Sequence, residues 1–246
     1  MENVIISNSE KFEKKKKIFK GGVNNFHVIA DFDKTLTQAF TEGNKVLSII
    51  AVLRNKNYLT EDYSGKAHTL FDNYHPYETN PDISIKEKKE KMNEWWMSHF
   101  DLLIKSGLNK NDLKNLIEED EIKLRKGVLE FIDFLYNKKI PLIIMSAGLG
   151  DAIKLYLEKE KRLYDNVHIV SNLFEWNSDG KAIKINQPII HSMNKDESTV
   201  ENLSIYKELE NRKNVLLLGD GLGDLGMIKG FEYDNLISIG FLNENV

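Results

Sequence analysis

The fold is decided by Val28-Ile29-Ala30-Asp31-Phe32-Asp33-Lys34-Thr35-Leu36-Thr37, where a short apolar strand runs directly into two aspartates. In an extended segment alternate side chains face the same way, so Asp31 and Asp33 converge on one point while Phe32 turns back into the core. Carboxylate oxygens suit Mg²⁺, and beside a metal one carboxylate acts as nucleophile while the other carries a proton. Taken alone, an Asp-x-Asp pair is more often a solvated turn.

A second apolar run, Ile140-Pro141-Leu142-Ile143-Ile144-Met145, predicts a buried strand that ends at Ser146. A helix is expected to follow over residues 151–161. The Ser146 hydroxyl and the backbone N–H groups freed by Gly148 and Gly150 fit the oxygens of a phosphate, because they stand near a helix start. A serine that only caps the helix is the simpler alternative.

A third apolar run, residues 215–218, enters the turn Gly219-Asp220-Gly221-Leu222-Gly223-Asp224. Glycines let the backbone approach an ion closely, so Asp220 is expected to join the two earlier aspartates around a metal, while Asp224 orients a water or braces the loop. In a doubly wound sheet, ligands bind beyond the carboxyl ends of the strands, where these three tips would meet. The sequence therefore predicts an α/β fold with a doubly wound, mostly parallel sheet.

Read together, these segments resemble the haloacid dehalogenase superfamily of phosphatases and, more closely, the cytosolic pyrimidine 5′-nucleotidase family. The segments that carry the resemblance are, in chain order, residues 31–37, 145–151, 170–172, 194–195, 217–220 and 240–243. The resemblance implies a Rossmann-like core with an inserted helical-bundle cap domain. It also implies Mg²⁺-dependent hydrolysis of nucleoside 5′-monophosphates of the cytidylate and uridylate type, through an aspartyl-phosphate.

The resemblance further implies a role for each residue of the reaction centre. Asp31 would be the nucleophile and a metal ligand. Asp33 would offer its backbone carbonyl to the metal and its side chain first as acid and then as base. Asp220 would complete the protein ligands of the metal. Three groups would bind the phosphate: Ser146, the Ala147 amide and Lys195.

Two further positions are expected, by the same resemblance, to read the nucleobase. Glu78, in Tyr77-Glu78-Thr79-Asn80-Pro81, aligns with a glutamate that contacts the base, and Ser98, in Trp96-Met97-Ser98-His99, aligns with a serine of the same pocket. Without the family both residues are equally well read as polar side chains on a helix surface. Of the adjacent Trp95 and Trp96, one is expected to pack inside the helices and the other to face the cleft.

The chain organisation predicts two parts, an α/β core over residues 1–40 and 125–246 and a helical cap over 41–124. Within the cap, helices are expected over residues 44–54, 86–105 and 110–124, where apolar residues recur at helical spacing. A hairpin around residues 174–183 is assigned to the core, because Asn177-Ser178-Asp179-Gly180 has the composition of a turn. The basic run 14–17 predicts a solvated helix face.

Composition narrows the class of protein. The 246 residues are 41% hydrophobic, carry a net charge of −4 and contain no cysteine, so disulfides and thiolate metal sites are excluded. No apolar run approaches the ~18 residues that span a bilayer. We expect a cytoplasmic monomer that acts on a small nucleotide and binds neither nucleic acid nor membrane.

Two alternatives remain open from the sequence. One is a phosphatase of the same superfamily that acts on another small phosphomonoester, such as a sugar phosphate or phosphoserine. The other is a catalytically silent nucleotide-binding protein, which would be expected to have lost at least one of Asp31, Asp33, Lys195 or Asp220. All four residues are present.

Overall fold

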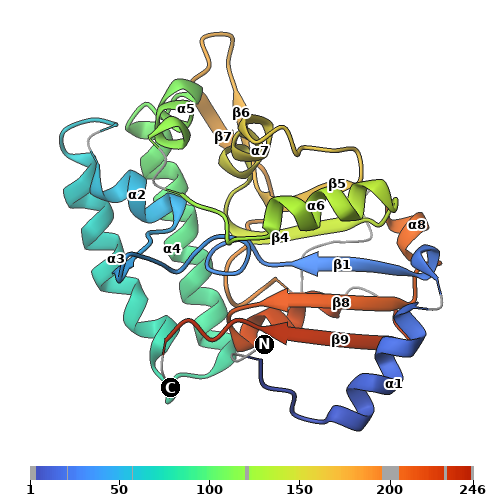
Figure 1. The fold of residues 1–246 in the computed structure, drawn as a ribbon. Coiled ribbons are helices and arrows are strands. Elements are labelled where there is room, and N and C mark those ends of the chain that lie inside the picture. The colour runs from blue at the N-terminus through green and yellow to red at the C-terminus, as the bar shows by residue number, and fades with distance from the viewer. Residues whose placement is uncertain are drawn as a thin grey trace.

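The centre of the molecule is one parallel sheet of five strands in the order β5-β4-β1-β8-β9 (Figure 1). The computed structural model describes residues 4–20, 22–56, 58–119, 122–195, 205–229 and 232–244. Every pairing between neighbouring strands of this sheet is parallel. The strands are β1 (Phe26–Ala30), β4 (Leu142–Leu149), β5 (Val167–Asn172), β8 (Asn214–Gly219) and β9 (Asn235–Gly240). The predicted α/β class is confirmed.

The order of the strands places the switch point at β1. The chain leaves β1 first toward β4 and later toward β8, on opposite sides of the central strand. Ala30 pairs with Ile144 on one side and with Leu218 on the other. Because the three strands are parallel and in register, the polar residues that follow them emerge at one edge of the sheet.

Helices α2 (Ile49–Asn55), α3 (Tyr63–Thr79), α4 (Ile85–Lys105) and α5 (Lys110–Glu118) lie beyond this edge, toward which the strand arrows point (Figure 1). The remaining elements are α1 (Ser9–Lys20), η1 (Val23–Asn25), β2 (Phe40–Thr41), β3 (Asn44–Lys45), α6 (Val128–Asn137), β6 (Phe174–Trp176), α7 (Gly150–Lys159), β7 (Ala182–Ile185), α8 (Tyr206–Leu209) and η3 (Leu222–Ile228). As predicted, the basic run lies on a helix, α1, that buries none of its residues.

The prediction of a helix over residues 44–54 is wrong at its start, because the helix begins at Ile49. Glu42 and Gly43 both have positive φ, which closes the β2–β3 hairpin and holds Asn44 and Lys45 in a strand. The helix begins only after Ser48, whose hydroxyl accepts a hydrogen bond from the Ala51 N–H. A helix expected to reach residue 124 ends at Glu118.

Helix α3 was not anticipated from the sequence, because its apolar pattern is weak. Only Tyr63 and Ala67 are buried in its 17 residues, and it contains Pro76. The hairpin of β6 and β7 is confirmed, with Gly180 in its turn at positive φ. It packs on the helices beyond the sheet edge, since the rings of Phe174 and Phe100 lie 5.7 Å apart in edge contact.

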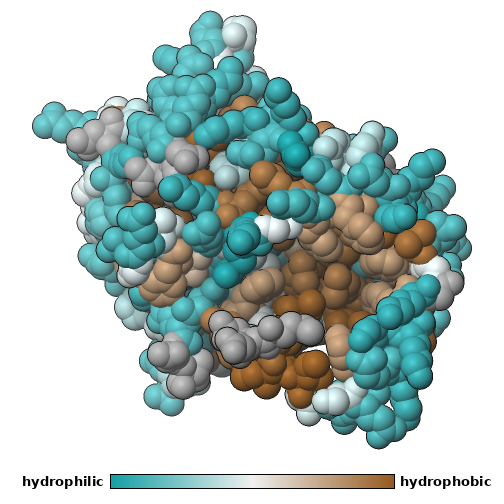
Figure 2. All heavy atoms as spheres, viewed as in Figure 1, coloured by the Kyte–Doolittle hydropathy of each residue, from teal (hydrophilic) through white to brown (hydrophobic). Residues whose placement is uncertain are grey.

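Helices cover both faces of the sheet. One apolar cluster joins β1 and β4 to α6 and α7, and a smaller one joins the opposite face to α8 and η3. In Figure 2 apolar residues also gather at the surface in the middle of the view, between α6 and α1. Among the described residues, no helix is both long and apolar enough to cross a membrane.

A buried histidine couples the fold to pH. The His27 side chain is fully buried in β1, and its Nδ1 donates a hydrogen bond to the Arg212 carbonyl oxygen at 2.9 Å. Burial lowers the pKa of His27 to about 4, although the hydrogen bond to Arg212 opposes the shift. In the unfolded chain a histidine titrates near pH 6.5, so the unfolded state binds a proton first as the pH falls.

We therefore expect the free energy of unfolding to fall by about 2 kcal/mol between pH 7.5 and pH 5 through His27 alone. The stabilisation is complete above the unfolded pKa and is lost progressively toward the folded one. Urea unfolding of His27→Gln should show a weaker pH dependence than wild type by that amount. The exposed His68 offers a control, and His68→Gln should follow wild type. Equal pH dependence in His27→Gln and wild type would contradict the expectation.

Candidate active site

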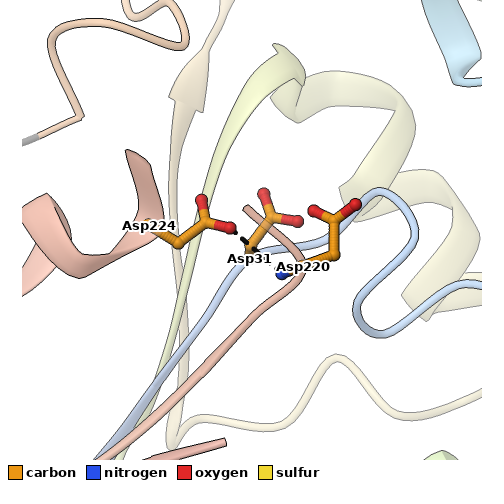
Figure 3. A group of neighbouring side chains, drawn as sticks. All are labelled: Asp31, Asp220 and Asp224. Atoms are coloured by element: carbon orange, nitrogen blue, oxygen red, sulfur yellow. Dashed lines mark hydrogen bonds between the residues drawn. The ribbon is translucent and has the colours of Figure 1, made fainter. Parts of the chain in front are cut away.

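Three aspartates from two strand ends meet at the edge of the sheet. One carboxylate oxygen from each of Asp31, Asp220 and Asp224 lies within 4.8 Å of the other two. Figure 3 shows the three carboxyl groups side by side, with Asp31 in the middle of the view. Asp31 follows β1, Asp220 follows β8, and Asp224 stands in η3. Between them Phe32 is fully buried, as its place in the extended segment predicts.

Lys195 is the cation that faces this cluster. Its Nζ donates to Asp31 Oδ1 at 2.5 Å and to Asp224 Oδ1 at 2.8 Å, and all three side chains are buried. Burial by itself would lower the pKa of Lys195, but the negative charges of Asp31 and Asp224 outweigh it and raise the pKa. Lys195 therefore stays charged and neutralises part of the cluster.

The positive charge of Lys195 does not balance all the carboxylates. Burial raises the pKa of Asp31 to about 6, against the attraction of Lys195, and repulsion from Asp224 adds to the rise. Burial also raises the pKa of Asp33 to about 7, with Asp31 as the next cause. A further cation would relieve this repulsion, and the ligands on offer are hard oxygens. The donor set thus fits a divalent metal such as Mg²⁺.

Glycines bring the supporting groups close to the cluster. A Cβ on Gly219 would lie 2.6 Å from the Cβ of Asp224, a distance that side chains do not tolerate. Asp224 uses this space to accept hydrogen bonds from the backbone N–H groups of Asp220 (3.1 Å) and Gly221 (2.9 Å). With Lys195 on its other oxygen, Asp224 is fully engaged and holds both the loop and the lysine. These hydrogen bonds brace the loop, and a role for Asp224 in orienting a metal-bound water stays a prediction.

Ser146 lies beside Asp33, across a third glycine. Its hydroxyl accepts a hydrogen bond from the Gly148 N–H at 3.0 Å. A Cβ on Gly148 would stand 3.2 Å from Ser146 Oγ and 3.4 Å from Asp33 Oδ2, so both polar groups border the same small space. Strand β4 continues past the predicted end at Met145, with a register shift before Leu149, and this irregular stretch presents Ser146 and Ala147.

A cavity of about 660 Å³ opens from the aspartates toward the helices, a size that suits a small ligand. Its inner end is lined by residues that the sequence indicated: Asp31, Asp33, Ser146, Ala147, Lys195 and Asp220. Its outer wall comes from α2, α3 and α4 and is largely aromatic. The residues that line this wall include Arg54, Phe71, His75, Glu78 and Trp95.

Glu78 lies in this wall, near the last turn of α3. Its Oε1 accepts a hydrogen bond from the Ser192 hydroxyl at 2.6 Å, and Ser192 also lines the cavity. The contact ties the helices to the loop that carries Lys195. Of the two tryptophans, Trp95 lines the cavity and Trp96 packs against Phe100, as expected of adjacent helical residues.

The structure does not bring Ser98 into the site. Ser98 is exposed on α4 and does not line the cavity, whereas Trp95 and His99 on the same helix are buried. Adjacent helical positions differ by about 100° in direction, so a side chain next to His99 points away from the face that His99 occupies. His99 instead shares a hydrogen bond of 3.0 Å with the Tyr63 hydroxyl.

Sequence reasoning missed several residues of the outer wall. On α3, the unpredicted Phe71 and His75 precede the predicted Glu78 by seven and three residues, which places all three on one face of the helix. On α2, Ala51 and Arg54 are spaced by three and share a face in the same way. Helical spacing was the available signal, but it required α3 to be recognised as a helix.

Comparison with known proteins agrees with the geometry. The model of the pyrimidine 5′-nucleotidase (UMPH-1) family matches residues 34–246. The chain is 37% identical to the 7-methylguanosine phosphate-specific 5′-nucleotidase of Mus musculus over 228 residues, which are 92% of this chain and 76% of that protein. It is 35% identical to the 7-methylguanosine phosphate-specific 5′-nucleotidase A of Xenopus laevis over 231 residues, 94% of this chain and 80% of that one.

Among solved structures, cytosolic 5′-nucleotidase IIIB bound to cytidine superimposes with a TM-score of 0.86. That structure is 27% identical, and the match covers 96% of this chain and 80% of the other. A substrate-bound phosphoserine phosphatase, with a TM-score of 0.51 and 18% identity, shares the fold alone. With a family match over most of its length and relatives above 30% identity, the chain belongs to the pyrimidine 5′-nucleotidase (UMPH-1) family, whose members are phosphomonoester hydrolases.

Proposed function

We propose that the protein hydrolyses nucleoside 5′-monophosphates, with a preference for cytidylate and uridylate. The observation that carries this proposal is the difference in chemistry between the two ends of the cavity. Its inner end holds the aspartates, Ser146 and Lys195, and its outer wall holds Phe71, Trp95 and Glu78. A mononucleotide has the same polarity, with a phosphate at one end and a flat base with hydrogen-bonding edges at the other.

The inner end is suited to phosphoryl transfer. A phosphate dianion repels a carboxylate, so Asp31 attacks phosphorus only where positive charge and N–H donors offset that repulsion. Lys195, already bonded to Asp31 Oδ1, supplies one such charge, and the Ser146 hydroxyl and Ala147 amide supply donors. Asp31, Asp220 and the Asp33 carbonyl would hold a Mg²⁺ ion, which when bound would withdraw charge from the phosphate oxygens.

Asp33 is suited to carry the proton. Its carboxyl is half-buried, with a pKa raised to about 7 by burial and by the neighbouring Asp31. A carboxyl with a pKa near neutral gives its proton to the departing nucleoside oxygen and then takes one from the water that cleaves the aspartyl-phosphate. The ester bond to the nucleoside breaks as the Asp31–phosphorus bond forms, and water returns Asp31 to its starting state with release of phosphate.

The residues of the outer wall would determine which nucleobase the protein prefers. Glu78 accepts hydrogen bonds, as it does from Ser192, so it suits the amino or N–H edge of a base. The family description and the cytidine in the related structure favour a pyrimidine. The names of the Mus musculus and Xenopus laevis relatives favour 7-methylguanylate, which is the second candidate. A cytoplasmic location is proposed as well, because the related structure is described as cytosolic.

The nucleophile is tested by Asp31→Asn. We expect phosphate release from cytidylate to fall by at least about 10⁴-fold, because an amide oxygen is too weak a nucleophile to attack phosphorus. Release by the wild type should also stop when EDTA removes divalent ions and return with added Mg²⁺. Asp101→Asn, an exposed aspartate on α4 that pairs with Lys105, is the matched control and should keep wild-type turnover. Near-normal rates in Asp31→Asn with Mg²⁺ present would contradict the assignment.

The base contact is tested by Glu78→Gln, assayed on cytidylate, uridylate, 7-methylguanylate, phosphoserine and ribose 5-phosphate. We expect kcat/KM for the preferred nucleotide to fall about 10- to 100-fold, since a charge-assisted hydrogen bond is lost. Ribose 5-phosphate, which has the ester without the base, should be much less affected. The wild-type ranking decides between pyrimidine and 7-methylguanine. A wild type that prefers phosphoserine or ribose 5-phosphate to every nucleotide would contradict the proposed function.

A further inference from the structure

Arg54 has a position in the cavity that the reaction described above does not use. It stands in the last turn of α2 and lines the outer wall. Its guanidinium carbon lies 4.1 Å from the centroid of the Phe71 ring, so the cation covers one face of that ring. Arg54 Nε is buried without a hydrogen-bond partner, and within the described ranges its guanidinium forms no hydrogen bond or ion pair.

Burying the Arg54 Nε–H without a partner is costly. Arginine carries five N–H donors in a rigid plane, and each donor withdrawn from water without an acceptor loses hydration that nothing replaces. The contact with Phe71 uses the flat face of the group and leaves the buried Nε–H without an acceptor. The arrangement is therefore explained if an acceptor arrives with a ligand.

The surroundings of Arg54 place it at the base end of the cavity. Burial lowers the pKa of Arg54, and electrostatic interactions with Tyr63 and Asp72 oppose the shift. Its guanidinium lies against Phe71 in the outer wall rather than among the aspartates at the inner end, which favours the base over the phosphate as the acceptor that it meets. Its neighbours in the cavity wall, Phe71, His75 and Trp95, are aromatic and suit the flat faces of a nucleobase.

We propose that Arg54 is a specificity-determining residue that donates hydrogen bonds to a carbonyl oxygen of the nucleobase. The inference rests on the proposed nucleotidase function and adds one requirement to it, a base that carries a carbonyl group. Cytosine and uracil both have such an oxygen, and adenine has none. Glu78 accepts and Arg54 donates, so the two together read an edge that offers both an N–H and a C=O.

The experiment compares kcat/KM for cytidylate, adenylate and ribose 5-phosphate in wild type and in Arg54→Met. Methionine keeps an apolar stem on Phe71 and removes the donors. We expect the ratio of cytidylate to ribose 5-phosphate to fall at least about tenfold, mainly through KM, while the ratio of adenylate to ribose 5-phosphate changes less than about twofold. Arg54→Lys keeps the charge but loses the planar fork, and an intermediate ratio is expected.

Lys56→Met is the matched control, because Lys56 lies two residues from Arg54 and pairs with Glu119 outside the cavity. It should keep all the wild-type ratios, which separates contact with the base from long-range charge. If Arg54→Met does not fold, Arg54→Lys carries the same comparison.

The outcomes separate the two proposals. A wild type without preference for cytidylate over ribose 5-phosphate contradicts the nucleotidase function, and the role of Arg54 falls with it. A wild type with that preference, retained in full by the Arg54 variants, overturns the role of Arg54 alone. A parallel loss on cytidylate and adenylate also overturns it, because adenine offers no carbonyl to Arg54.

Discussion

The site depends on the balance of charge around one buried lysine. Lys195 bonds at once to Asp31 and Asp224, and both carboxylates are withdrawn from water. Burying a charge without a partner is strongly unfavourable, so these three side chains hold one another in place. Lys195 supplies one positive charge against several carboxylates, and repulsion between neighbouring carboxylates adds to the effect of burial in raising the pKa values of Asp31 and Asp33. The remaining repulsion is what makes the cluster receptive to a divalent cation, and with it to a phosphate ester.

Two features of the fold bring these charged groups together: the register of the parallel strands, and glycines whose lack of a side chain leaves room for neighbouring groups. Parallel pairing of β1 with both β4 and β8 delivers the aspartates and the serine to one edge. Gly219 leaves room for Asp224 to reach Lys195 and the turn at once, and Gly148 leaves room between Ser146 and Asp33. The helices beyond the edge then complete a cavity whose walls differ in chemistry from one end to the other. In the proposed function, specificity and catalysis would be carried by separate parts of the chain, which meet at the hydrogen bond between Ser192 and Glu78.

The aspartates and the serine at the inner end of the cavity could be predicted from the sequence, because they directly follow apolar strands that must run side by side, whereas Lys195 was implied only by the resemblance to the family. Asp31, Ser146 and Asp220 were placed by that rule alone. The outer wall could not, since Arg54 and Phe71 meet through packing between helices, and α3 buries too few apolar residues to be recognised. Ser98 illustrates the same limit, because a one-residue difference on α4 separates the buried His99 from the exposed Ser98. The hairpin at Glu42 and Gly43 was hidden by a helix-like composition after it.

The most direct test of this account is anomalous diffraction from crystals grown with Mn²⁺ in place of Mg²⁺. We expect one peak within about 2.2 Å of a carboxylate oxygen of Asp31 and of Asp220, with Lys195 still bonded to Asp224. A protein that turns over nucleotides in Mn²⁺ yet shows no ion at these two aspartates would contradict the central claim. So would an ion held by other residues, with Asp31 and Asp220 too far apart to share it.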